Sequence, residues 1–342
     1  MPRKSLEIQP LPRWARLSGA ALDAAPDAHF CAGAALARLD HILRSGADLS
    51  CAGKDSGDVS SAGKSRGEGG SEPAFVGALR RRLALRAAAA CAAMARLRED
   101  VVALRDAEHL GGFDAASTPG GRLHGLWRLF ATCPARLDAR FIRAAADCLE
   151  LPPHIDCEAL AALLREALTY ENPLNAAARV SARALNILDD APQIDAEIFA
   201  LWFADLVLAR RLAWAGPLPL LATTIMDPSM RTATGRRPRP SDPDWPLSVA
   251  RAIARAAQQA HALASELSRR SETLLSVAPK LRARGAARVV VLLLADDCVS
   301  PARAARAAGL SDRASRRLFD RLVALGAVRE LSGRGNFRLY GL

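Results

Sequence analysis

The chain has 342 residues, of which 50% are hydrophobic and only 5% aromatic, and its net charge is +11. This length allows one large domain or two ordinary ones, with ample material for a buried core. Much of the hydrophobic fraction is alanine, which is the best helix former but fills thick cores poorly. The composition therefore favours closely packed helices and argues against a β-sandwich.

The positive charge is concentrated in the last third of the chain. Residues 231–342 contain 21 Arg and Lys and 9 Asp and Glu, a net charge of +12, whereas residues 1–230 contain 26 and 27, a net charge of −1. Such segregation indicates a polyanionic partner for one domain, usually nucleic acid. GC-rich coding would explain why only four residues are lysine, but it would not explain the asymmetry along the chain.

Cysteine usage and hydropathy indicate the cellular setting. The seven cysteines are scattered without a CxxC pair, which is typical of reduced thiols in a cytosolic protein. His154 and Cys157 have an HxxC spacing, but no second close ligand pair accompanies them, so we predict no metal site and no cofactor. The start of the chain has no apolar signal region, and no apolar stretch approaches about 18 residues. We expect a soluble, cytoplasmic protein without a membrane partner.

The first 73 residues contain little regular pattern. Prolines interrupt residues 1–28, which we expect to form an irregular arm, and a helix is expected at 29–44. Residues 46–73 are rich in Gly, Ser and charge, which predicts a disordered linker. Within it GDVSSAGKS (57–65) resembles a phosphate-binding loop, but five residues rather than four separate Gly57 from Gly63. We interpret this segment as linker.

An all-helical domain is expected over residues 29–278. Apolar residues recur at spacings of three and four from 74 to 110, which predicts one continuous helix ending at Gly111 and Gly112. Further helices are expected at about 121–131, 136–150, 156–170, 173–189, 194–214 and, after a proline-rich stretch, 247–277. Short linkers between them imply antiparallel neighbours in a multi-helix bundle or array.

No catalytic motif is present in the sequence. There is no GxSxG, HExxH or GxGxxG pattern, and the six histidines are dispersed. Glu108 and His109 are interpreted as helix-end residues near the helix dipole, and the pairs Asp189-Asp190 and Asp296-Asp297 as solvated helix caps. We therefore predict that the protein is not an enzyme.

The most specific pattern lies in residues 279–342. The apolar run at 289–294 has alanines on both sides, which favours a buried helix over a strand. Ser300-Pro301 predicts the start of a short helix over 301–307, and Ser311 caps another that ends at Gly326. Residues 327–331 and 336–340 alternate as a β-hairpin does, with Phe337 and Leu339 on one side. This order predicts a winged helix-turn-helix domain at the C-terminal end of a mainly α protein.

In a helix-turn-helix, the second helix enters the major groove through its N-terminal residues. Arginine there can bind guanine edges or neutralise phosphates. The candidate DNA-binding residues are Arg313, Ser315, Arg316, Arg317 and Arg321 on this helix, with Arg334 at the hairpin tip and Arg338 beside it.

Two resemblances accompany these patterns. Residues 310–340 look like the winged helix-turn-helix of Fic-type proteins and many bacterial regulators, but the Fic motif HxFxxGNGR is absent, so AMP transfer is not implied. The segments LLSVAPKLRARGA (274–286), RRLFDRLVALGAVRELSGRGNFRLYGL (316–342), ALRDA (103–107) and PLPLL (217–221) resemble the bacterial family called domain of unknown function 1403. That resemblance implies frequent occurrence on plasmids and no assigned activity.

Two hypotheses for function follow. The first is a DNA-binding protein, of the plasmid-associated regulator type, whose helical domain could serve for homodimerisation. The second is a protein-interaction or scaffold protein that uses its winged helix for packing or dimerisation. Asp312, at the start of the second helix, favours the second hypothesis, because its carboxylate would repel phosphate.

Overall fold

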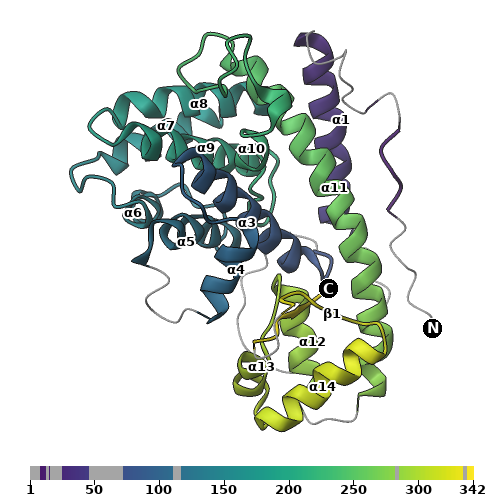
Figure 1. Ribbon diagram of the computed structural model, residues 1–342. Coiled ribbons are helices and arrows are strands. Elements are labelled where there is room, and N and C mark those ends of the chain that lie inside the picture. Colours follow the sequence, from purple (N-terminus) through teal and green to yellow (C-terminus); the bar gives the residue numbers. More distant parts are fainter. Residues whose placement is uncertain are drawn as a thin grey trace, which may run out of the picture.

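Helices make up most of the described chain (Figure 1). The computed structural model describes residues 8–12, 15, 25–45, 72–110, 117–281, 285–333 and 337–342. Most of the expected N-terminal arm and of the linker at 46–73, including the GDVSSAGKS segment, lies outside these residues. The prediction of a mainly α protein is confirmed.

The helices mostly lie where the sequence predicts them. Their bounds are α1 Ala25–Arg44, α3 Val76–Met94, α4 Val101–Leu110, α5 Pro119–Thr132, α6 Ala139–Cys148, α7 Cys157–Ala167, α8 Pro173–Ile187, α9 Gln193–Arg211, α10 Leu221–Thr224, α11 Trp245–Val277, α12 Ala286–Ala295, α13 Pro301–Ala308 and α14 Asp312–Ala324. Thr118, Asp138, Asp156 and Asn172 cap the N-termini of α5 to α8 with their side chains. None of the described helices is long and apolar enough to cross a membrane.

The prediction of a single helix over 74–110 is wrong. The chain leaves α3 after Met94 and enters α4 at Val101. Arg96 has a φ of +57°, and the amide of Leu97 donates to Ala92 O at 2.9 Å while that of Arg96 donates to Ala93 O at 3.1 Å. This is a Schellman ending built without glycine, so no glycine in the sequence marks it. Asp100 then accepts from the amide of Ala103 and starts α4.

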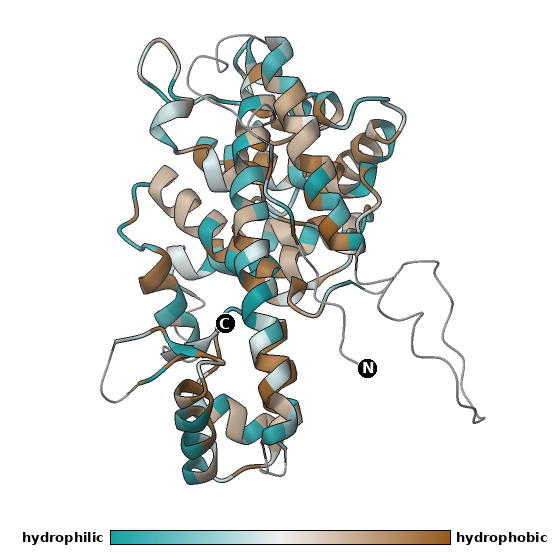
Figure 2. Ribbon diagram, turned by 90° about the vertical axis from the view of Figure 1, so that its right-hand side faces the viewer, coloured by the Kyte–Doolittle hydropathy of each residue, from teal (hydrophilic) through white to brown (hydrophobic). Residues whose placement is uncertain are grey.

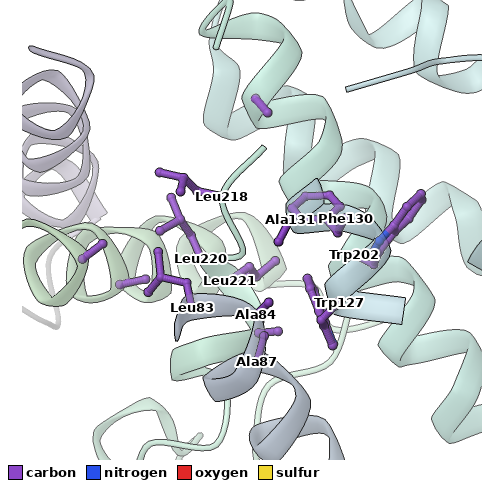
Figure 3. Close-up of a cluster of buried hydrophobic side chains, with 14 of the residues drawn as sticks. Leu83, Ala84, Ala87, Trp127, Phe130, Ala131, Trp202, Leu218, Leu220 and Leu221 are labelled. Carbon is purple, nitrogen blue, oxygen red and sulfur yellow. The ribbon is translucent and has the colours of Figure 1, made fainter. Parts of the chain in front are cut away.

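Helices α1 and α3 to α10 form what we call the helical body, and a cluster of aromatic side chains forms its centre. Figure 3 shows Trp127, Phe130 and Trp202 beside the small residues Ala84 and Ala87 of α3. The ring of Phe130 lies 5.6 Å, centroid to centroid, from both Trp127 and Trp202, in edge-on geometry. Alanine on α3 allows α5 to approach closely, and the large rings of α5 and α9 fill the remaining volume.

The buried carboxylate of Asp205 joins α9 to the segment before α10. Its Oδ2 accepts from the amide of Leu220 at 2.9 Å, and its Oδ1 accepts from that of Leu221 at 3.0 Å. These amides start a helix of only four residues and would otherwise be buried without acceptors. Burial raises the pKa of Asp205 from 3.8 to about 7, against the opposing effect of the two amide donors.

The longest helix, α11, connects the helical body to the C-terminal segment. Its 33 residues span roughly 50 Å at 1.5 Å per residue. One part lies alongside α1, and the other leads to α12, α13 and α14 at the opposite end of the molecule from α7 and α8 (Figure 1). Teal and brown residues alternate along α11 in Figure 2, as expected of a helix with one buried face.

The C-terminal segment combines α12, α13 and α14 with two very short strands. The apolar run at 289–294 is helical, as predicted. β1, Arg329–Glu330, pairs antiparallel with β2, Tyr340–Gly341, and Val299 exchanges two backbone hydrogen bonds with Tyr340. The ring of Tyr340 stacks on that of Phe319 of α14, with centroids 4.4 Å apart. Leu339 is buried, but Phe337 is 58% exposed, so the predicted common environment for these two side chains is wrong.

The raised pKa of Asp205 predicts a pH-dependent stability. Between pH 4 and 7 the unfolded chain releases the Asp205 proton while the folded chain retains it, so the free energy of unfolding falls as pH rises, by at most about 1.4 kcal/mol per pH unit. Asp205→Asn removes this contribution. The measurement is urea denaturation from pH 4 to 8. The unfolding free energy of wild type minus that of the variant should fall as pH rises to about 7 and then level off. Parallel pH profiles would contradict the assignment.

Candidate functional site

Four arginines lie on the outer side of α14: Arg313, Arg316, Arg317 and Arg321. We call this surface the α14 face. All four are exposed, and none forms an ion pair with a described residue. The helix that carries this face, α14, lies at the lower end of the molecule in Figure 1. These guanidinium groups are therefore available to an anionic partner.

The pattern of α14 explains why these side chains face outward. Leu318, Phe319 and Leu322 are at most 5% exposed and pack toward α13 and the strands. The arginines occupy the opposite side of the same helical repeat. Ser311 caps the helix by accepting from the amide of Ala314 at 3.2 Å. The sequence thus determines both where α14 begins and which side carries charge.

Ser315 is not available for DNA, contrary to the sequence prediction. Its side chain is fully buried, and its hydroxyl donates to Pro301 O at 2.8 Å. It lies on the same side of α14 as Leu318 and Phe319, so the helical period already indicated burial. Its role is to hold α13 against α14.

Of the two candidate DNA-binding residues in the hairpin, the structure describes one. Arg334 lies outside the described residues. Arg338 is exposed, and a hydrogen bond to the Tyr340 hydroxyl raises its pKa above the ordinary value. The exposed ring of Phe337 lies next to it in the chain. A cation beside an exposed aromatic ring could contact a polyanion or a base.

Two acidic residues and one further arginine modify the charge near this surface. Asp312 and Asp320 are exposed on α14, so the face is not uniformly positive. Arg306 on α13 is also exposed and forms no ion pair with the described residues. The sequence prediction omitted Arg306, although its place just before the turn could have indicated it.

A second group of polar and charged residues, some buried and some half-buried, lies where the C-terminal segment meets the helical body. We call it the buried polar cluster. It comprises Glu108 and His109 of α4, His124 and Arg128 of α5, Asp296, Asp297 and Cys298 after α12, and Arg303 of α13. Asp296 and Asp297 are only 2% and 5% exposed, so their interpretation as solvated caps is wrong.

Ion pairs connect the members of this cluster across three elements. Oδ2 of Asp296 lies 2.6 Å from Nη2 of Arg303 and 3.8 Å from Nη2 of Arg128. Arg128 also pairs with the Glu108 carboxylate. Asp296 therefore links α5 of the body to α13 of the C-terminal segment through paired charges, as burial requires.

His109, Asp297 and Cys298 form the most enclosed part of the cluster. One ligand atom from each lies within 4.8 Å of the other two. Nε2 of His109 lies 3.9 Å from Oδ1 of Asp297. The interpretation of His109 as a simple helix-end residue does not account for this position.

Burial controls the protonation of this region. It lowers the pKa of His124 to about 4, so that imidazole is neutral at pH 7. Burial, together with the carboxylates of Asp297 and Asp296, raises the pKa of the Cys298 thiol well above its usual range. The cysteine is therefore a thiol rather than a reactive thiolate.

Hydrogen bonds and close backbone packing complete the junction. Nη2 of Arg105 donates to Leu331 O at 3.0 Å, and Nη2 of Arg82 donates to Leu342 O at 2.6 Å. A Cβ on Gly77 would lie 2.8 Å from the Cα of Ala295, so only glycine allows α3 to approach α12 this closely. The C-terminal segment is thus held against α3, α4 and α5.

Removing the central carboxylate should loosen this junction. Asp296→Asn takes the charge from Arg128 and Arg303, whose side chains are 28% and 30% exposed. Because solvent reaches both, we expect a loss of about 1–3 kcal/mol in unfolding free energy, measured by urea denaturation. The control is Asp190→Asn, at an exposed side chain, with an expected change within about 0.5 kcal/mol. Equal stability of the two variants would contradict the role of Asp296.

Comparison with known proteins identifies a family. No curated protein matches the chain. A family model described as "Protein of unknown function (DUF1403)" matches residues 69–342. That range contains α3 to α14, both strands, the α14 face and the buried polar cluster. The chain therefore belongs to the DUF1403 family.

Proposed function

We propose that the protein binds DNA through the α14 face. The observation that carries this proposal is the exposure of Arg313, Arg316 and Arg317 without ion-pair partners among the described residues. Unpaired guanidinium groups attract phosphate strongly and can also bind guanine edges. An arginine already paired with an acid would have to give up that partner first.

The pairing of the other C-terminal arginines supports this choice. Arg237 pairs with buried Glu197, Arg255 with Asp227, and Arg329 with Glu266. Each of these positive charges is paired with an acidic side chain of the same chain. Among the described residues of 231–342, exposed arginines without an ion pair are therefore most concentrated on α14, which a net charge for this range does not reveal.

The order of elements also supports the proposal. A three-residue turn, with Gly309 at a φ of +65°, joins α13 to α14, and β1 and β2 follow. This is the order of a winged helix-turn-helix, in which α14 would be the recognition helix. Its 13 residues span roughly 20 Å, enough to lie along a major groove.

A protein-interaction or scaffold role is the alternative. Asp312 and Asp320 on the α14 face favour it, because their carboxylates would repel phosphate. Exposed Val323 and Phe337 would suit a protein partner of mixed charge and apolar character. DNA remains our proposal, since the four arginines of the face outnumber its two acids.

The direct test is alanine substitution at Arg313, Arg316 and Arg317 together. If each contacts one phosphate, the salt dependence of the DNA association constant should weaken by about 0.9 per lost contact on a log–log plot. We also expect at least a tenfold weaker affinity at low salt. Fluorescence anisotropy with a labelled mixed-sequence duplex measures both.

The matched control removes the same charge from the helical body. Arg136, Arg140 and Arg165 are exposed and form no ion pair with described residues. Their triple alanine variant should retain wild-type DNA affinity within about twofold. Equal DNA affinity of the α14 triple variant and wild type at low salt would refute the proposal, as would equal weakening in both triple variants.

Asp312→Asn gives a test of opposite sign. If phosphate approaches the N-terminus of α14, removing this carboxylate should strengthen DNA binding about two- to tenfold, because it removes a like-charge repulsion. The Asn side chain is nearly isosteric and leaves the Ser311 cap in place. Weaker DNA binding by this variant would instead favour an interface in which Asp312 meets a cationic partner.

A further inference from the structure

The buried polar cluster brings together the three ligand types that a borderline transition metal prefers. His109 supplies an imidazole nitrogen, Asp297 a carboxylate oxygen and Cys298 a sulfur, and these atoms all lie within 4.8 Å of one another. We propose that His109, Asp297 and Cys298 bind a divalent transition metal ion, Zn²⁺ in the first instance. This inference is independent of the proposed DNA binding.

The donor set determines the class of metal. Zn²⁺ accepts nitrogen, thiolate sulfur and carboxylate oxygen, usually four ligands in a tetrahedron. Mg²⁺ and Ca²⁺ prefer all-oxygen sites and would gain little from His109 or Cys298. Three protein ligands would leave one position for water or for the Glu108 carboxylate, whose Oε2 lies 3.9 Å from the same His109 nitrogen.

A second observation points to a ligand at His109. Its side chain is only 4% exposed, and its Nε2 forms no hydrogen bond with any described residue. A buried ring nitrogen without such a partner costs free energy. A metal–nitrogen bond would satisfy this atom, and Nε2 is the atom that faces Asp297.

One of the three ligand–ligand spacings, between His109 and Asp297, is close to that of a loaded site. Around a tetrahedral Zn²⁺ with bonds of about 2.0–2.1 Å to nitrogen and oxygen, these two ligands lie about 3.4 Å apart. The observed 3.9 Å between Nε2 of His109 and Oδ1 of Asp297 needs a shortening of about 0.5 Å.

Neighbouring groups would hold the ligands in place. The amide of Asp297 donates to Oδ1 of Asp296 at 3.0 Å, and Arg303 in turn fixes Asp296. Such outer contacts orient ligands in metal sites. The carboxylates of Glu108 and Asp296 also offset the charge of Arg128, which would otherwise repel a cation.

Metal binding would join two parts of the chain. His109 lies in the last turn of α4 in the helical body, whereas Asp297 and Cys298 follow α12. The bond to sulfur forms as the thiol releases its proton to water, and no change of oxidation state is needed. The ion would then stabilise the folded protein by binding only the assembled site.

The test uses full-length protein that a chelator has freed of metal, and this protein is titrated with Co²⁺. A charge-transfer band reports a thiolate ligand on Co²⁺, and bands in the visible range report four-coordination. Wild type should bind one equivalent and show both. Cys298→Ser should lose the charge-transfer band, and His109→Gln should bind at least tenfold more weakly. Cys148→Ser, outside the cluster, should match wild type. Zn²⁺ should displace Co²⁺. It should raise the Tm of wild type and of any variant that shows the Co²⁺ bands, but not the Tm of a variant without them.

Circular dichroism of each variant establishes that it is folded, and the wild-type titration is decisive even if a variant fails to fold. Absence of a thiolate band in folded wild type would overturn the proposal. A thiolate band that persists in Cys298→Ser would also overturn it, because the sulfur ligand would then lie elsewhere. In either case the buried polar cluster is an ion-pair junction alone.

Discussion

The position of the C-terminal segment depends on one constraint, the need to pair the buried carboxylates after α12. Asp296 is almost completely removed from solvent, so its charge must be matched within the protein. Its partners, Arg128 and Arg303, come from the helical body and from α13. Pairing therefore fixes the segment against α5. Since the inner side of the segment is used in this contact, α14 lies on the outer side with its arginines exposed.

The same constraint divides the arginines into two classes. Those near buried acids, such as Arg237 beside Glu197, hold the fold together. Those on the α14 face have no described ion-pair partner and form a concentrated positive surface. Arginine suits both tasks, because its planar guanidinium group binds carboxylates and phosphates with the same geometry. Whether each arginine is paired with an acid is therefore a better indicator of a polyanionic partner than the net charge along the sequence.

Local signals in the sequence predicted most of the helices, and tertiary contacts explain what was missed. Capping residues such as Ser300 and Ser311 mark helix starts in any context. The end of α3 was missed because Arg96 adopts a left-handed conformation that the sequence gives no glycine to indicate. The α14 arginines were predicted from their place on the second helix of a helix-turn-helix pattern. His109 and Cys298 are 189 positions apart, and only the packing of α4 against the C-terminal segment brings them together.

The salt dependence of DNA binding by the unmodified protein tests the central claim most directly, because it counts the phosphate contacts. Four exposed arginines on the α14 face predict that the logarithm of the association constant falls with the logarithm of salt concentration with a slope of about −3 to −4. The slope should be the same for duplexes of different sequence. An association constant that does not change with salt, or no DNA binding at low salt, would contradict a phosphate-binding role for this face.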